Sequence, residues 1–239
     1  MAVRKSIEFP RAALRRVFFQ RCFYLFVVLL ALIGVSPFIE GTRGTYLLAG
    51  FNAFVVLASA AALGRTALSF LLVFVLIGGA VGLRFASLEP GREPLFNWAL
   101  LLHALVYICV LFLLLRYVFG PEVMDGDRLW GAASAYLMIG ILWCFIYALV
   151  ELEYSQTFLV RGDPSNLQLI ELLYFSFSTL TTIGFGDIVP ISRGAQAAAI
   201  FEGIVGTLFL AILIAKLVGV YPPPVREPHN GGAQDETQR

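Results

Sequence analysis

Charged residues are scarce in this sequence. Of its 239 residues, 14% are charged and 59% are hydrophobic, whereas soluble domains have roughly 25% charged and about 45–50% apolar residues. This composition excludes an ordinary soluble globular protein. Lys and Arg total 17 against 16 Asp and Glu, so the chain has no basic excess to attract nucleic acid. Its 3 cysteines all lie in apolar runs, where a free thiol is a small buried hydrophobe, so a disulfide scaffold is also excluded.

Groups for catalysis are lacking as well. The sequence contains no nucleophile–base set, no cluster of metal-ligating residues and no glycine-rich phosphate loop. We therefore expect a protein that is not an enzyme and that uses no cofactor.

Long apolar runs dominate the sequence instead. A helix needs about 20 apolar residues to cross the hydrocarbon core of a bilayer. The runs predict six membrane-spanning helices, at residues 22–39, 45–64, 66–83, 94–115, 129–150 and 194–220. The expected fold class is therefore an all-α membrane protein.

The positive charges predict the orientation of these helices. Residues 1–21 form a basic leader, which the positive-inside rule places in the cytoplasm. The alternative is an amphipathic helix that lies on the inner leaflet. An even number of spans puts both termini on the cytoplasmic side of a multi-pass cell (inner or plasma) membrane protein. Residues 221–239 are polar and proline-rich and are expected to be a disordered cytoplasmic tail.

The connection before the last span contains a further apolar segment. Residues 165–181 read as a helix of about four turns, which opens with the capping residues Ser165 and Asn166 behind Asp163 and Pro164. At about 1.5 Å per residue this helix is too short to span a bilayer. It predicts a re-entrant helix whose chain returns as non-helical backbone, which at membrane depth must be buried in protein or line a wet cavity.

The returning segment is rich in small residues and reads Thr-Thr-Ile-Gly-Phe-Gly-Asp at positions 181–187. Gly184 and Gly186 permit backbone conformations that turn successive carbonyls to one side of an extended strand. Four such strands around one axis would form stacked rings of carbonyl oxygens, with the Thr182 hydroxyls as the lowest ring. These rings can replace the hydration shell of a large monovalent cation.

This segment closely resembles the selectivity filter of potassium channels, which is commonly written TTVGYGD. The resemblance extends from residue 129 to about residue 220 and implies that Thr181 and Asp187 support the filter. K⁺ ligands are implied at Thr182, Ile183, Gly184 and Phe185, and Gly186 completes the ion-binding residues. Phe185 replaces the more common Tyr and lacks its phenol hydroxyl, so we expect the filter to be held by different neighbours.

A complete pore needs four chains, because the motif occurs once per chain. The sequence thus predicts a homotetramer in the lipid bilayer with K⁺ as its permeant ion and no nucleic-acid partner. Residues 22–119 are expected to form an uncharged four-helix domain in the position of a voltage sensor. Residues 129–220 are expected to form the pore domain, with an outer helix, a pore helix at 165–181, a filter at 182–187 and an inner helix at 194–220.

The inner helix holds the residues expected to control the gate. By the same resemblance, Gly206 occupies the position of the gating hinge; the alternative is a glycine that only permits close helix packing. The residues expected to line the cavity and lower gate share one helical face and are Thr207, Leu210, Ile214 and Val218.

Glu202 lies deep in this inner helix, where an unpaired charge is costly. One hypothesis is a protonation-sensitive group that couples pH to conductance. The alternative is a carboxyl satisfied by pore-helix hydroxyls such as those of Ser176, Ser178 or Thr179.

The first four helices lack the regularly spaced cations of a voltage sensor. Span 94–115 contains His103 and is followed by Arg116, whereas a sensor helix carries several gating charges. We expect His103 to be a packing residue, with a pH sensor as the alternative. The predicted function is a K⁺-selective channel that is not conventionally voltage-gated. The alternatives are a non-selective monovalent cation channel and a non-conducting regulatory subunit of channel fold.

Overall fold

The apolar runs of the sequence fold as helices, since a helix satisfies its own backbone hydrogen bonds in a lipid environment. The computed structural model describes residues 21–38, 67–87, 94–121, 125–154 and 157–220. Its helices are α2 (Arg21–Val35), the 3₁₀ turn η1 (Ser36–Phe38), α4 (Ala67–Ala86), α5 (Pro94–Val118), α6 (Gly126–Glu153), α7 (Leu169–Leu180) and α8 (Arg193–Val220).

Within the described residues, four helices are long and apolar enough to cross a membrane. They are Arg21–Phe38, Pro94–Val118, Gly126–Glu153 and Arg193–Gly219, and they coincide with four of the six predicted runs. Helix α4 has 20 residues and covers residues 67–83 of the predicted run 66–83. The predicted run 45–64, the tail 221–239 and all of the basic leader except Arg21 lie outside the described residues.

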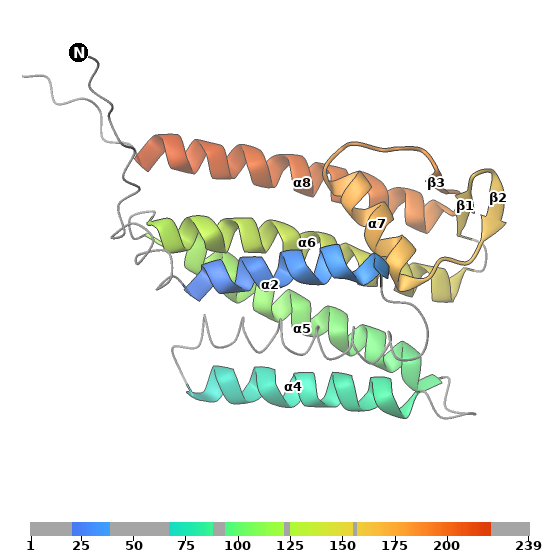
Figure 1. Ribbon diagram of the computed structural model, residues 1–239, viewed down its shortest axis with the longest axis horizontal. Coiled ribbons are helices and arrows are strands. Elements are labelled where there is room, and N and C mark those ends of the chain that lie inside the picture. The colour runs from blue at the N-terminus through green and yellow to red at the C-terminus, as the bar shows by residue number, and fades with distance from the viewer. Residues whose placement is uncertain (1–20, 39–66, 88–93, 122–124, 155–156, 221–239) are drawn as a thin grey trace, which may run out of the picture.

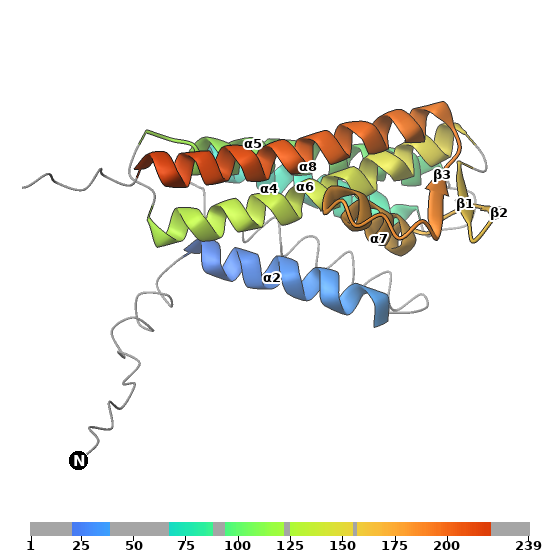
Figure 2. The same cartoon turned by 90° about the horizontal axis from the view of Figure 1, so that it is seen from above.

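Helix α6 lies at the centre of the bundle. It packs against α2, α5, α7 and α8, whereas α4 packs against α5 at the side farthest from α8 (Figure 1). The buried interior includes Tyr107 and Leu114 of α5 and Met138 and Tyr147 of α6. Figure 2 shows α2 and α8 on different sides of α6, so α6 separates α2 from α8.

One end of the bundle is fixed by Asp127 at the start of α6. Its carboxylate accepts hydrogen bonds from the backbone N–H of Cys22 at 2.9 Å and from the hydroxyl of Tyr117 at 2.8 Å. The preceding Asp125 caps α6 through the backbone N–H of Arg128 at 3.0 Å. These contacts join the beginnings of α2 and α6 to the end of α5.

A small antiparallel sheet covers the other end. Its strands β1 (Phe158–Val160), β2 (Asp163–Ser165) and β3 (Ile188–Pro190) are arranged in the order β2-β1-β3. Leu159 pairs with Pro164 on one side and with Val189 on the other. Arg161 and Gly162 have φ values of 53° and 98°, as a two-residue hairpin turn requires. The all-α expectation missed this sheet, because strands of three residues leave no alternating pattern in the sequence.

Candidate functional site

The short helix α7 carries the candidate site and begins later than the sequence predicts. The predicted bounds were 165–181, but α7 comprises Leu169–Leu180, so the predicted start is wrong. The reason is that Asp163–Ser165 pair with β1 as strand β2. The helix starts where the Glu171 carboxylate accepts the backbone N–H of Gln168 at 2.8 Å, which satisfies one of the free donors at a helix N-terminus.

Two glycines allow α7 to lie very close to the long helices on either side of it. A Cβ atom at Gly140 of α6 would lie 2.7 Å from the ring of Phe177. A Cβ atom at Gly206 of α8 would lie 2.5 Å from the carbonyl oxygen of Leu180. The same oxygen accepts a hydrogen bond from the Tyr136 hydroxyl at 3.2 Å. Helix α7 is thus held between α6 and α8 by a ring contact at Gly140 and a backbone contact at Gly206, and a side chain at either glycine would obstruct its contact.

The loop after α7 is hydrogen-bonded to Ser178 through its backbone N–H groups. Those of Ile183 and Gly184 donate to the Ser178 carbonyl at 3.0 and 3.1 Å. The Phe185 N–H donates to the Ser178 hydroxyl oxygen at 3.4 Å, and the Thr182 N–H donates to the carbonyl of Thr179 at 2.9 Å. The loop therefore turns consecutive amide donors toward α7.

The carbonyls of this loop point the other way. In a trans peptide the C=O and N–H groups lie on opposite sides of the chain, so the carbonyls of Thr182, Ile183 and Gly184 face away from Ser178. Of the residues that the structure describes, none donates a hydrogen bond to these three oxygens. Positive φ values at Thr182 (60°), Gly184 (57°) and Gly186 (78°) produce this arrangement. All residues from 181 to 186 are exposed in the single chain.

The C-terminal end of the loop is held at Asp187. Its carboxylate accepts the Tyr174 hydroxyl at 3.0 Å, and its carbonyl accepts the backbone N–H of Arg161 at 2.8 Å. The Tyr174 ring is stacked on Phe185 with 5.9 Å between ring centroids. Desolvation, the hydrogen bond to Asp187 and the negative charge of that group raise the pKa of the Tyr174 phenol. Tyr174 therefore keeps its proton and provides, from α7, a hydroxyl that Phe185 lacks.

The threonine at the inner end of the loop faces back toward α7. The Thr181 hydroxyl donates to the carbonyl of Phe177 at 2.6 Å, and its backbone N–H donates to the same oxygen at 3.0 Å. Thr181 thus closes the last turn of α7. Its neighbour Thr182 begins the segment with positive φ values.

Glu202 lies behind α7 and is completely buried. Its two carboxyl oxygens lie 2.5 Å from the Ser176 hydroxyl and 2.5 Å from the Tyr147 hydroxyl. The Ser176 oxygen also lies 2.7 Å from the carbonyl oxygen of Gly140. Of the hydroxyls expected near Glu202, the structure brings that of Ser176 into contact, whereas Ser178 holds the loop. Tyr147 was not predicted as a partner of Glu202. The only signal in the sequence was a phenol hydroxyl within an apolar run, which needs a hydrogen-bond partner.

The residues expected to line a cavity lie on an exposed side of α8. Leu210, Ile214 and Val218 are 43%, 60% and 70% exposed in the single chain. The Thr207 hydroxyl is also exposed and donates to the carbonyl of Gly203 at 2.8 Å. Gly206 is buried against Leu180 and therefore lies off this exposed face.

His103 packs between α5 and α6, as a packing role requires. It is buried, its Nδ1 lies 2.7 Å from the carbonyl oxygen of Ala99, and its ring is stacked on Phe145 of α6 at 5.6 Å. The ring therefore fills the α5–α6 contact.

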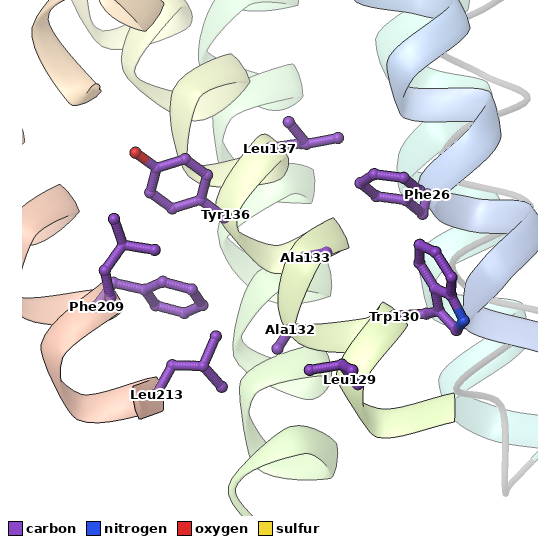
Figure 3. A pocket seen from close by; sticks show the side chains of 10 residues that line it. Phe26, Leu129, Trp130, Ala132, Ala133, Tyr136, Leu137, Phe209 and Leu213 are labelled. Atoms are coloured by element: carbon purple, nitrogen blue, oxygen red, sulfur yellow. The ribbon is translucent and has the colours of Figure 1, made fainter. Parts of the chain in front are cut away.

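A separate hollow lies along α6, between α2 and α8 (Figure 3). Its volume is about 310 Å³ and its lining is apolar. The lining residues come from three helices and include Phe26, Trp130, Tyr136, Leu137 and Phe209. This hollow has no charged group in its lining and is distinct from the loop 181–187.

Comparison with known proteins agrees with this geometry. A family model described as an ion channel matches residues 135–221. The potassium channel protein kcv of Paramecium bursaria Chlorella virus 1 is 30% identical over 78 residues, which are 33% of this chain and 81% of the relative. Protein LctB of Bacillus caldotenax is 28% identical over 96 residues, which are 38% of this chain and 71% of the relative.

A further relative matches over a longer stretch of the chain. The voltage-gated potassium channel Kch of Escherichia coli (strain K12) is 27% identical over 166 residues. These residues are 66% of this chain and 38% of that relative, so the match covers well under half of the length of Kch. No solved structure matches the chain.

Proposed function

The chain belongs to the potassium channel family, and on this premise we propose that it conducts K⁺ selectively through a pore made by four identical chains. The observation that carries the proposal is the orientation of the peptide groups in residues 182–185. Their N–H groups are bound to α7, and the carbonyls between them face away from α7 without a donor among the described residues.

Four copies of this loop around one axis would present these carbonyls to a common channel. Rings of such oxygens replace the water around a dehydrated K⁺ ion. The proposed ligands are the oxygens of Thr182, Ile183, Gly184 and Phe185, with Gly186 completing the filter and Thr181 and Asp187 supporting it. The exposure of residues 181–186 in the single chain supports a site that only the assembly encloses.

The pore helix adds an electrostatic contribution to this proposal. Helix α7 ends at Leu180 directly before the loop, and a helix C-terminus carries about half an elementary negative charge. Four such ends would stabilise a cation in a central cavity. The inner helix α8 would line this cavity with Thr207, Leu210, Ile214 and Val218. Gly206 would provide the hinge, and the apolar side chains would close the pore by dewetting.

The proposed topology has six spans, with residues 45–64 as the second, in the cell membrane and with both termini in the cytoplasm. A conventional voltage sensor is not part of the proposal. Helix α5 contains Arg116 in its last turn and no other Lys or Arg, whereas voltage sensing requires several gating charges in each subunit.

Cation uptake into liposomes that contain the purified protein tests this function. K⁺ uptake well above Na⁺ uptake is the expected result, together with a tetramer mass in detergent. Gly184→Ala is the control, because Gly184 has a φ of 57° that disfavours any side chain. Equal uptake of K⁺ and Na⁺ would indicate a non-selective channel. No uptake by a properly assembled protein would indicate a non-conducting subunit.

A further inference from the structure

The carboxyl group of Glu202 belongs to a chain of oxygen atoms that joins three helices. Tyr147 and Gly140 come from α6, Ser176 comes from α7 and Glu202 comes from α8. The contacts are Tyr147 hydroxyl to Glu202 at 2.5 Å, Glu202 to Ser176 hydroxyl at 2.5 Å and Ser176 hydroxyl to the Gly140 carbonyl at 2.7 Å. Tyr147, Ser176 and Glu202 are all completely buried.

The number of available protons decides whether all three of these oxygen–oxygen contacts are hydrogen bonds. Two oxygen atoms at such distances attract each other only if a proton lies between them. The three contacts need three protons, but the hydroxyls of Tyr147 and Ser176 supply one each and a carbonyl supplies none. The third proton must come from Glu202, so its carboxyl group is present as the neutral acid.

The surroundings of Glu202 agree with a neutral acid. The titratable groups that face it are Tyr136, Cys144 and Tyr147, all on α6. From α7 it meets the Ser176 hydroxyl, and no Lys, Arg or His of the described residues approaches it. An ionised carboxylate without a cation is strongly disfavoured at membrane depth.

We propose that Glu202 is a protonated positioning residue that holds the pore helix α7 between α6 and α8 and thereby fixes the filter. The protonated carboxyl donates to Ser176, Ser176 donates to the Gly140 carbonyl, and the Tyr147 hydroxyl donates to the second oxygen of Glu202. Ser178, which holds the backbone of Ile183, Gly184 and Phe185, lies two residues beyond Ser176 on α7. The positioning role rests on the proposed function, whereas the protonation state does not.

Loss of the Glu202 proton has a defined consequence. Ser176 then has one proton for two acceptors and must give up its contact with either Glu202 or Gly140. The pore helix loses a link to α6 or α8, and the filter loses part of its support. A Gln at position 202 supplies the same groups at every pH, because its amide donates to Ser176 and its carbonyl accepts from Tyr147.

Infrared spectroscopy of the purified protein at neutral pH tests the protonation state without any need for conduction. The spectrum of Glu202→Gln is expected to lack the carbonyl stretch of a protonated carboxyl and to keep all carboxylate bands. Glu153→Gln is the control, since Glu153 is exposed and its removal is expected to decrease the carboxylate bands instead. A loss of carboxylate intensity in Glu202→Gln would overturn the proposal.

K⁺ flux as a function of pH tests the positioning role. The wild-type flux is expected to fall as the pH rises through the ionisation of Glu202, and the flux of Glu202→Gln to be independent of pH over the same range. Ser176→Ala, which removes the middle hydroxyl of this hydrogen-bond series, is expected to lower the ratio of K⁺ to Na⁺ flux at every pH, because α7 then lacks its links to Glu202 and Gly140. Identical pH profiles for wild type and Glu202→Gln would overturn the positioning role.

Failure of the proposed function gives a different result. A wild-type protein without K⁺ flux at any pH would contradict the channel and the positioning role together. The infrared comparison would still decide whether Glu202 carries a proton.

Discussion

Gly206 of α8 lies against the carbonyl oxygen of Leu180 at the end of α7. A Cβ atom at position 206 would lie 2.5 Å from that oxygen and 2.9 Å from the Cδ1 atom of Leu180. The hydroxyl of Tyr136 donates to the same oxygen at 3.2 Å. The absence of a side chain at position 206 is therefore a packing requirement of α7 against α8.

The thermal stability of a Gly206 variant tests this packing requirement. Gly206→Ala forces Leu180 to move and is expected to destabilise the protein by about 1–3 kcal/mol, the usual effect of overpacking. Gly203→Ala is the matched control, because nothing lies within 4 Å of a Cβ atom at that position. Thermal unfolding in detergent provides the measurement. Equal stability of the two variants would contradict the packing role.

Gly140 has the corresponding role on α6. Gly140→Ala places a methyl group 2.7 Å from the ring of Phe177, so we expect a similar loss of thermal stability. Because the obstacle is a side chain, a smaller residue removes it, and Phe177→Leu in the same chain is expected to restore part of the lost stability. A double variant that is less stable than Gly140→Ala would contradict this contact.

The hydrogen bond from Tyr174 to Asp187 supports the end of the loop 181–187, the proposed filter. Tyr174→Phe removes the hydroxyl that lies 3.0 Å from the Asp187 carboxylate and keeps the ring stacked on Phe185. One hydrogen bond is worth about 0.5–1.5 kcal/mol, so K⁺ current at low external K⁺ is expected to decline faster than in the wild type. Tyr154→Phe, which alters an exposed phenol at the end of α6, is the control. Equal decline in both variants would count against this support.

Lys216 joins the lower part of α8 to the end of α5. Its ammonium group donates to the carbonyls of Val118 at 2.9 Å and Gly120 at 3.2 Å, which are helix-end acceptors. Lys216→Met is expected to accelerate hydrogen exchange of the last turns of α8, because the link between the helices is lost. Lys216→Arg keeps donors at this position and is expected to retain more of the protection. Unchanged exchange in Lys216→Met would refute the link.

Parts of the fold and the site were accessible from the sequence for physical reasons. Length and apolarity define a membrane helix, so the runs 94–115, 129–150 and 194–220 were predicted within a few residues. The sequence 181–187 indicated a loop with carbonyls turned to one side, because Gly184 and Gly186 admit the left-handed backbone that the structure contains. Spacing and composition are local properties, and they were sufficient at these positions.

The remainder depends on contacts between distant residues. The start of α7 was misplaced because Ser165 belongs to a strand that needs β1 as its partner. Tyr147 and Gly140 were missed because their roles arise only when α6 lies against α7 and α8. The predicted span 45–64 and the predicted tail lie outside the described residues.

The most direct test of the proposed function is the reversal potential of the purified protein in a planar bilayer. KCl is placed on one side and an equal concentration of NaCl on the other, so that any selectivity appears as a voltage at zero current. The account predicts a large shift of the reversal potential toward the K⁺ equilibrium potential, because the carbonyls of residues 182–185 would fit dehydrated K⁺. A measurable current that reverses near zero would contradict it.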